Sequence, residues 1–173
     1  MKKIMIVDDN YLSAEGIEKN IDWETLNAEI IHVCYNGTSA IEAMKKEPAD
    51  LIISDIEMPD LDGISMSRQA LEINPMVKII LISAYDKFEY ARRALLLGAL
   101  DYIEKPLDYA YLIQKVKNAF ALMEKEQKNL QLLKQSRPLL TEKFFREITH
   151  LPSSEAAYRL KPYLKVSEPG AEL

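Results

Sequence analysis

The chain has 173 residues, of which 48% are hydrophobic and 28% are charged, and its formal net charge is −5. This composition is typical of one soluble domain with additional material, or of two small domains, and it excludes a disordered chain and a disulfide-rich miniprotein. An acidic chain also lacks the basic surface that binds DNA or RNA, so we expect no direct contact with nucleic acid.

The cysteine count and the length of the apolar segments indicate the compartment. The single cysteine, Cys34, permits no internal disulfide and fits a reducing environment, where we interpret it as a small buried residue. The first apolar run, Ile4–Val7, ends at Asp8 and is too short for a signal peptide. No apolar run approaches the roughly 20 residues that span a bilayer. We therefore expect a soluble, cytoplasmic protein without membrane contact.

Short apolar segments alternate along the chain with segments of helical period. The predicted strands are Ile4–Val7, Ile30–Val33, Leu51–Ile53, Ile79–Ile82 and, more weakly, Leu100–Ile103. Apolar residues at helical spacing follow the first four strands: Leu12, Ile17 and Ile21; Ala40, Ile41 and Met44; Ile64, Met66, Ala70, Leu71 and Ile73; Phe88, Ala91, Ala94 and Leu95. Continuous β-branched runs are typical of strands buried on both faces of a parallel sheet. The alternation predicts an α/β fold with helices on both faces of the sheet.

A fifth helix is predicted to begin at the N-cap candidate Asp108 and to end at Pro138. Its apolar positions form a heptad seam with one polar member, which consists of Leu112, Val116, Ala119, Met123, Glu126, Leu130 and Leu133. We expect the first four to pack on the sheet, whereas Leu130 and Leu133 lie beyond it and need another partner.

The region after Pro138 changes in composition. Five apolar residues there predict a separate short helix: Leu139, Leu140, Phe144, Phe145 and Ile148. Residues 139–173 are interpreted as the start of an incomplete region, or as a tail that docks on the first domain or on a second copy. We therefore predict two parts, a domain of residues 1–125 and a helical linker region of residues 126–173.

Chemically active side chains follow four of the five predicted strands. Asp8 and Asp9 follow the first strand, Asp55 ends the third, Ser83 ends the fourth and Lys105 follows the fifth. In an open parallel sheet, ligands bind outside the carboxyl ends of the strands. Each residue alone has an ordinary interpretation, such as a helix cap or a surface lysine. Their coincidence at one edge favours a single site.

Three crowded carboxylates repel one another, so a divalent cation is needed to neutralise them. All-oxygen ligation indicates Mg²⁺, which takes one or two carboxylates, a carbonyl and several waters. The sequence therefore predicts a magnesium site.

These segments together resemble the receiver domain of bacterial two-component response regulators. The resemblance covers about residues 2–125 and rests on the segments 6–9, 54–63, 81–84 and 101–106. It implies a flavodoxin-like (βα)5 fold, a doubly wound parallel sheet of strand order 2-1-3-4-5, here with an extended C-terminal helical linker. It also implies a chain that accepts a phosphoryl group from a sensor histidine kinase and is not a turnover enzyme.

The resemblance assigns roles by position. It makes Asp55 the phosphoacceptor, and it makes Asp8, Asp9, Asp55 and the main-chain carbonyl of Glu57 the ligands of Mg²⁺, directly or through water.

The remaining assigned residues carry the signal. The resemblance makes Ser83 the switch hydroxyl that bonds the phosphoryl group, Lys105 the cation that pairs with that group, and Tyr102 the aromatic residue that swings inward with Ser83. It also implies a cis peptide bond between Lys105 and Pro106.

A finer resemblance concerns regulators that carry an AraC-type DNA-binding domain, which would be a transcriptional output absent from this chain. It rests on the segments 83–91, 21–23 and 139–145. Tyr85, Phe88 and Tyr90 fit either local packing or a partner surface. We expect a homodimer through the long fifth helix, or through the face made by the fourth helix, the fifth strand and the fifth helix.

Other functions remain as alternatives. A degenerate receiver that only binds partners is disfavoured, because every required residue is present. A phosphatase of the haloacid-dehalogenase type would place an Asp-x-Asp pair after the first strand, and Asp8-Asp9 lacks that spacing. A flavin-binding flavodoxin would require a phosphate-binding loop there, which is missing.

Overall fold

The computed structural model describes residues 1–84, 92, 96 and 98–148, and it describes side chains up to residue 134. The fourth predicted helix, with Tyr85, Phe88 and Tyr90, lies outside the described residues, as do residues 149–173. The chain divides into two units, Met1–Met123 and Glu124–Leu173. The predicted division after residue 125 stays a prediction.

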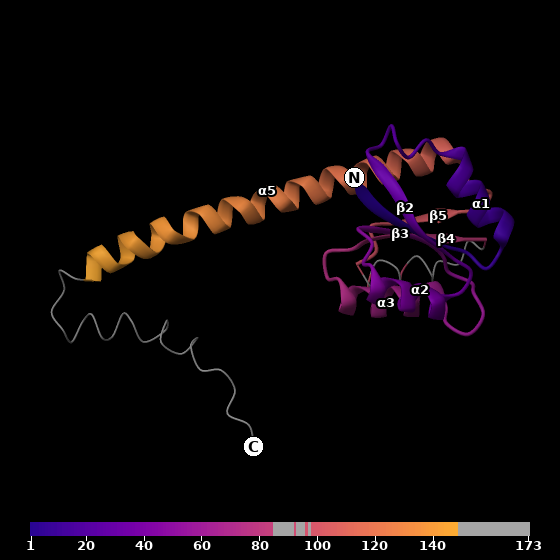
Figure 1. Cartoon of the computed structure of the whole chain (residues 1–173), viewed down its shortest axis with the longest axis horizontal. Coiled ribbons are helices and arrows are strands. Elements are labelled where there is room, and N and C mark those ends of the chain that lie inside the picture. The colour runs from indigo at the N-terminus through magenta and orange to yellow at the C-terminus, as the bar shows by residue number, and fades with distance from the viewer. Residues whose placement is uncertain (85–91, 93–95, 97, 149–173) are drawn as a thin grey trace, which may run out of the picture. The chain divides into compact units, whose positions relative to one another are not determined.

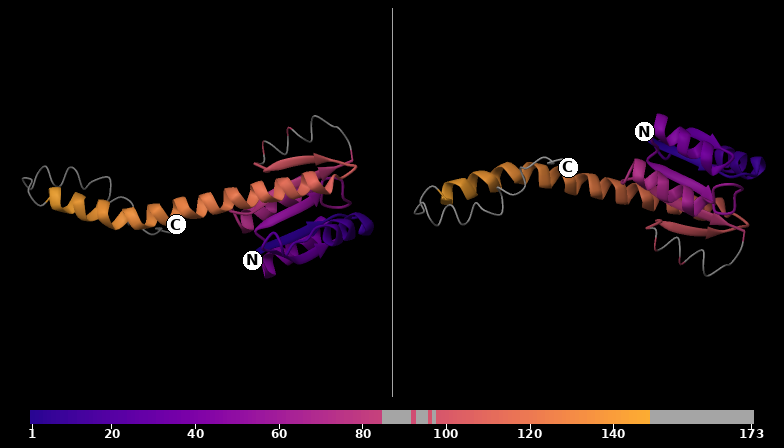
Figure 2. Two further views of the ribbon diagram at one scale, coloured as in Figure 1. Left: turned by 90° about the horizontal axis from the view of Figure 1, so that it is seen from above. Right: turned by 90° about the horizontal axis from the view of Figure 1, so that it is seen from below.

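Five parallel strands form the sheet of the first unit (Figures 1 and 2). The strands are β1 (Lys2–Val7), β2 (Ala28–Cys34), β3 (Leu51–Asp55), β4 (Lys78–Ser83) and β5 (Asp101–Glu104). Their order across the sheet is β2-β1-β3-β4-β5, and every neighbouring pair is parallel. The predicted flavodoxin-like order is therefore confirmed.

The described helices cover both faces of this sheet (Figure 1). They are α1 (Tyr11–Asn20), α2 (Gly37–Lys46), α3 (Gly63–Ile73) and α5 (Tyr109–Ile148). Polar side chains begin each one, because their oxygens accept hydrogen bonds from the free N–H groups of the first turn. The caps are Asn10, Asn36, Asp62 and the predicted Asp108.

Alternation along the strands produces two apolar cores, one on each face. Met5 and Val7 of β1 face α2 and α3, whereas Ile4 and Ile6 face α1 and α5. On the second face, the predicted seam residues of α5 are buried against the sheet, namely Leu112, Val116, Ala119 and Met123. This confirms the part of the seam that was expected to pack on the sheet.

The predicted helix end at Pro138 is wrong, because α5 runs without interruption from Tyr109 to Ile148. A separate short helix after Pro138 is therefore also wrong, and the segment 139–148 belongs to α5. An interior proline removes one hydrogen bond of the helix, and its ring crowds the carbonyl of the residue four positions earlier, at a combined cost of about 3 kcal/mol. Good helix formers such as Leu132, Leu133, Leu139 and Leu140 flank Pro138 and favour helix on both sides.

Among the described residues, no helix combines the length and apolar character that a membrane crossing requires.

Candidate functional site

The predicted site residues lie at the carboxyl ends of the strands. Asp8 follows β1 directly, Asp55 is the last residue of β3, Ser83 is the last residue of β4, and Lys105 follows β5. Because all strands run in the same direction, these ends meet at one edge of the sheet. The fold therefore brings together residues that are up to 97 positions apart in the chain.

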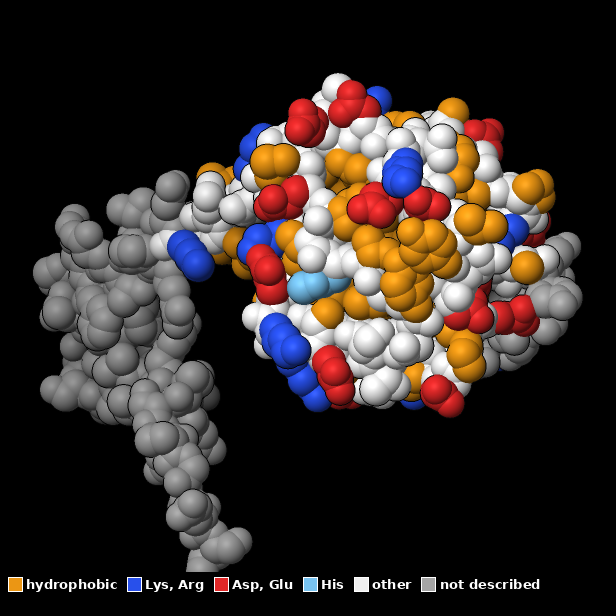
Figure 3. Space-filling view, turned by 45° about the vertical axis from the view of Figure 1, so that its right-hand side comes forward, with side chains coloured by type: hydrophobic (Ala, Val, Ile, Leu, Met, Phe, Trp, Pro, Cys, Tyr) orange, Lys and Arg blue, Asp and Glu red, His pale blue; other side chains and the backbone are white. Residues whose placement is uncertain are grey.

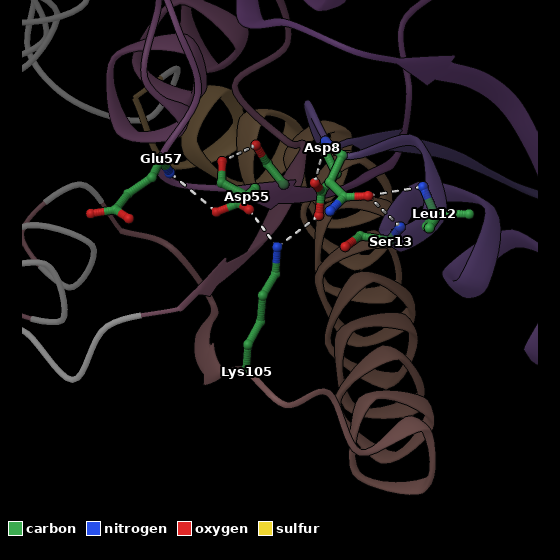
Figure 4. Close-up of polar contacts among 8 residues, drawn as sticks. Asp8, Leu12, Ser13, Asp55, Glu57 and Lys105 are labelled. Carbon is green, nitrogen blue, oxygen red and sulfur yellow. Dashed lines mark hydrogen bonds and ion pairs between the residues drawn. The ribbon is translucent and has the colours of Figure 1, made fainter.

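Lys105 joins the two buried carboxylates of the site (Figure 4). Its Nζ lies 3.0 Å from Oδ2 of Asp8 and 2.5 Å from Oδ2 of Asp55. Asp8 is 1% exposed and Asp55 is 6% exposed. The main-chain N–H of Lys105 donates to the carbonyl oxygen of Ser83 at 2.8 Å, which anchors the loop after β5 to the end of β4. The Lys105-Pro106 peptide bond is cis, as predicted.

The second oxygens of the two carboxylates are bound by main-chain groups. Oδ1 of Asp8 accepts from the N–H of Asn10 at 2.9 Å, and Oδ1 of Asp55 accepts from the N–H of Glu57 at 3.1 Å (Figure 4). Each carboxylate is therefore fixed in orientation by one main-chain donor and one ammonium group. Fixed orientation is what an attack on an electrophile requires.

Burial and ion pairing shift the pKa values of Asp8 and Lys105. Burial raises the pKa of Asp8, although the hydrogen bonds from Lys105 and from the N–H of Asn10 act in the opposite direction. Burial lowers the pKa of Lys105, but the hydrogen bonds to Asp55 and Asp8 outweigh that effect and leave it raised. Lys105 is therefore charged at neutral pH and stabilises negative charge on the carboxylates beside it.

Three carboxylates form a group that fits a metal ion. Oxygen atoms of Asp8, Asp9 and Asp55 all lie within 4.8 Å of one another. Asp9 is exposed, so this oxygen cluster opens to solvent on one side. The donors are hard oxygens, and the ammonium of Lys105 pairs with two of the three carboxylates, those of Asp8 and Asp55. Both facts fit a small divalent cation such as Mg²⁺.

Two predicted residues lie outside this carboxylate cluster. Ser83 is fully buried at the end of β4 and pairs in the sheet with Glu104. Tyr102 is half-buried on β5 and packs against the core that α2 and α3 cover. Glu57 contributes its main-chain N–H to Asp55, and its carbonyl as a metal ligand stays a prediction.

Sequence reasoning missed three contributors to the site. Asn10 caps α1, and its main-chain N–H donates to the carboxylate of Asp8. Gly63 lies against the main chain of Asp55, where a Cβ would stand 2.0 Å from the carbonyl oxygen.

The third is Ser54, whose hydroxyl donates to that same oxygen at 2.8 Å. A hydroxyl inside an otherwise apolar strand was the signal that could have revealed it.

Known proteins give an independent comparison. Residues 4–117 match the family model described as "Response regulator receiver domain". YesN of Bacillus subtilis (strain 168), described as an uncharacterized transcriptional regulatory protein, is 29% identical over 126 residues, which are 73% of this chain and 34% of YesN. The chain thus spans about a third of that relative.

Solved structures are similar over the same region. The receiver domain of AraT, a response regulator from Geobacillus stearothermophilus, is 34% identical with a TM-score of 0.69, and the match covers 73% of this chain and 98% of that one. A two-component transcriptional regulator AraC from Clostridium phytofermentans ISDg is 30% identical with a TM-score of 0.66, covering 75% and 99%.

Proposed function

The chain belongs to the receiver-domain family of response regulators, and we propose that it accepts a phosphoryl group from a sensor histidine kinase on Asp55. The observation that carries the proposal is the arrangement around this carboxylate. Asp55 is buried at the end of a strand. One of its carboxylate oxygens forms an ion pair with the ammonium of Lys105, and the other accepts a hydrogen bond from the N–H of Glu57.

The proposed transfer forms a P–O bond to Asp55 and breaks the P–N bond of the kinase phosphohistidine. Charge on the phosphoryl oxygens must be stabilised during this displacement. Lys105 supplies a cation beside the acceptor oxygen. Asp8, Asp9 and Asp55, with the carbonyl of Glu57, would hold Mg²⁺, which when bound supplies further neutralisation of the phosphoryl oxygens.

Magnesium removal tests this function. Incubated with acetyl phosphate and Mg²⁺, the full chain is expected to gain one phosphoryl group by intact-protein mass spectrometry. EDTA is expected to prevent the gain, because the carboxylate cluster then lacks its counter-charge. The adduct should be absent in Asp55→Asn, and an adduct that persists there would assign the phosphoryl group to another residue.

The donor is proposed to approach beside α1. A pocket at this position borders both Asp8 and Lys105, and its lining further comprises Leu12, Ser13, Ile17, Ile82, Pro106, Leu107 and Tyr109. Leu12 and Tyr11 of α1 are exposed, and the Tyr11 ring lies 5.7 Å from that of Tyr35. Figure 3 shows hydrophobic side chains gathered on one surface of this unit among charged ones. Apolar residues next to a reactive site support docking of a protein donor rather than diffusion of a small molecule alone.

The output is proposed to be transcriptional, since YesN and the Clostridium protein are described as transcriptional regulators. An AraC-type DNA-binding domain outside these 173 residues is the proposed form of that output. Receiver domains are generally not turnover enzymes, and we propose that each molecule is phosphorylated once and slowly loses the group again.

We propose that Ser83 and Tyr102 report the state of Asp55 to the surface of β5 and α5. Ser83→Ala is expected to be phosphorylated at the rate of the unmodified protein but to show little further response, because the hydroxyl that bonds the phosphoryl group is missing. Such couplings typically amount to about 1–3 kcal/mol. NMR shifts of β5 and α5 amides, before and after phosphorylation, measure the response. Shifts as large as those of the unmodified protein would contradict the role of Ser83.

We also propose a homodimer that uses α5. Leu130 is 46% exposed and Leu133 is 67% exposed, and both continue the heptad pattern of the helix after Met123. The structure does not describe the side chains of Leu139, Leu140, Phe144 and Phe145. Two copies that pair their leucines would remove this apolar surface from water. Packing of the chain's own tail on the same leucines is the alternative.

A further inference from the structure

The carbonyl oxygen of Asp55 is enclosed by two neighbours. The hydroxyl of Ser54 donates to it at 2.8 Å, and Ser54 is 0% exposed. Gly63 packs against the same oxygen. A Cβ at position 63 would stand 2.0 Å from this oxygen, so any side chain there would collide with it. The oxygen is therefore restricted in direction by a hydrogen bond and by close packing.

The peptide group that follows Asp55 is held at both of its ends. Its oxygen accepts from Ser54, and its N–H, which belongs to Ile56, donates to the carbonyl of Ile82 at 2.9 Å. A planar peptide that is bound at both ends has little freedom to rotate. This peptide carries the chain from Asp55 to Glu57, whose N–H holds Oδ1 of Asp55 at 3.1 Å. The direction of the acceptor side chain therefore depends on the plane that Ser54 fixes.

A hydroxyl at position 54 is not explained by packing. The preceding residues of β3, Leu51, Ile52 and Ile53, are fully buried and apolar. Burying a hydroxyl carries a cost that its hydrogen bond offsets. An apolar side chain would carry no such cost and would fill the core equally well. The hydroxyl instead makes its bond to the one residue that is proposed to react.

We infer that Ser54 is a positioning residue for phosphoryl transfer, which acts by fixing the main-chain carbonyl of Asp55. The inference rests on the proposed function of Asp55. Loss of the hydroxyl leaves the carboxylate, Lys105 and the metal ligands in place but removes one of the constraints on the peptide after Asp55, so that its orientation is held less tightly. The acceptor oxygen then spends less time in line with the phosphorus, and the rate falls without loss of the site.

Ser54→Ala in the full chain tests the inference, with Ser67→Ala as its matched control. Ser67 is also fully buried, and its hydroxyl donates to the carbonyl of Gly63 at 2.6 Å within α3 rather than to the carbonyl of Asp55. Both variants lose one buried hydroxyl and should unfold at similarly lowered temperatures. Phosphorylation by phosphoramidate, followed by mass spectrometry, gives the rate constant at saturating donor and Mg²⁺.

We expect about a tenfold lower rate constant in Ser54→Ala, which corresponds to about 1.4 kcal/mol in the barrier. The Mg²⁺ concentration at half-maximal rate should stay within about twofold, and Ser67→Ala should keep the original rate constant. Ser54→Thr, which restores the hydroxyl, should recover most of the rate. If the extra methyl group prevents folding, the alanine pair still decides.

Two outcomes would overturn the inference alone: a rate constant in Ser54→Ala within twofold of the original, or an equal loss in both alanine variants. An unmodified protein that gains no phosphoryl group would instead overturn the proposed function and this inference together.

Discussion

Lys105→Ala is expected to lower the rate of phosphoryl transfer to Asp55 by about a hundredfold or more. The ammonium of Lys105 bridges Asp8 and Asp55, at 3.0 and 2.5 Å, where negative charge accumulates during transfer. Removing one preorganised charge-stabilising group from a site typically costs about 10²–10³ in rate. Mg²⁺ binding should persist, because the oxygen ligands remain. Any phosphorylated molecules should give no conformational response, since the contact between cation and phosphate is absent.

Lys115→Ala provides the matched control. Lys115 also forms an ion pair, with Asp101 at 2.7 Å, and its ammonium lies 4.8 Å from the ring centre of Tyr111. It lies on α5 and takes no part in the contacts of Asp55. Phosphorylation rates from mass spectrometry, with Mg²⁺ titrated in parallel, separate transfer from metal binding. Equal rates in Lys105→Ala and Lys115→Ala would remove Lys105 from the proposed mechanism.

The double substitution Leu130→Asp and Leu133→Asp is expected to dissociate the proposed dimer while leaving phosphorylation of Asp55 unchanged. Burial of a leucine side chain contributes roughly 1.5–3 kcal/mol, so two leucines in each copy account for much of the affinity of a modest dimer. A charge at either position would also be desolvated in the interface. Sedimentation of the full chain, with and without acetyl phosphate, measures the association.

Lys128→Asp is the control for charge in this experiment. It changes the net charge by two, from +1 to −1 at one position, as the two leucine substitutions do together. Lys128 is exposed and lies two residues from Leu130, at a heptad position opposite the seam. The control should remain dimeric. If the unsubstituted chain is monomeric at high micromolar concentration, both with and without phosphorylation, a dimer through the heptad seam of α5 is ruled out.

The sheet and the position of the site could be predicted because both depend on local pattern. The runs that end at Val7, Ile53 and Ile82 are apolar and continuous, so their strand character and the position of their carboxyl ends are visible in the chain. Parallel pairing then brings those ends to one edge of the sheet, independently of the conformations of the loops.

Contacts that depend on three-dimensional approach could not be predicted. Nothing in the chain indicates that Gly63 lies on the carbonyl of Asp55, since that contact arises where the loop after β3 returns to the strand. Pro138 failed as a stop signal for a different reason. A proline lowers helix stability by a finite amount, and the preference of its neighbours in a long helix can exceed it.

The ion pair between Lys105 and Asp8 joins residues 97 positions apart, and that between Lys105 and Asp55 joins residues 50 apart. During synthesis, therefore, the acceptor leaves the ribosome long before the lysine that completes its surroundings. Contacts between distant segments also form late, because large loops must close first. A nascent or partly folded molecule thus carries Asp55 without the cation beside it. If Asp55 accepts the phosphoryl group as proposed, a molecule in which β5 has not joined the sheet is expected to react slowly, because Lys105 is not yet beside Asp55.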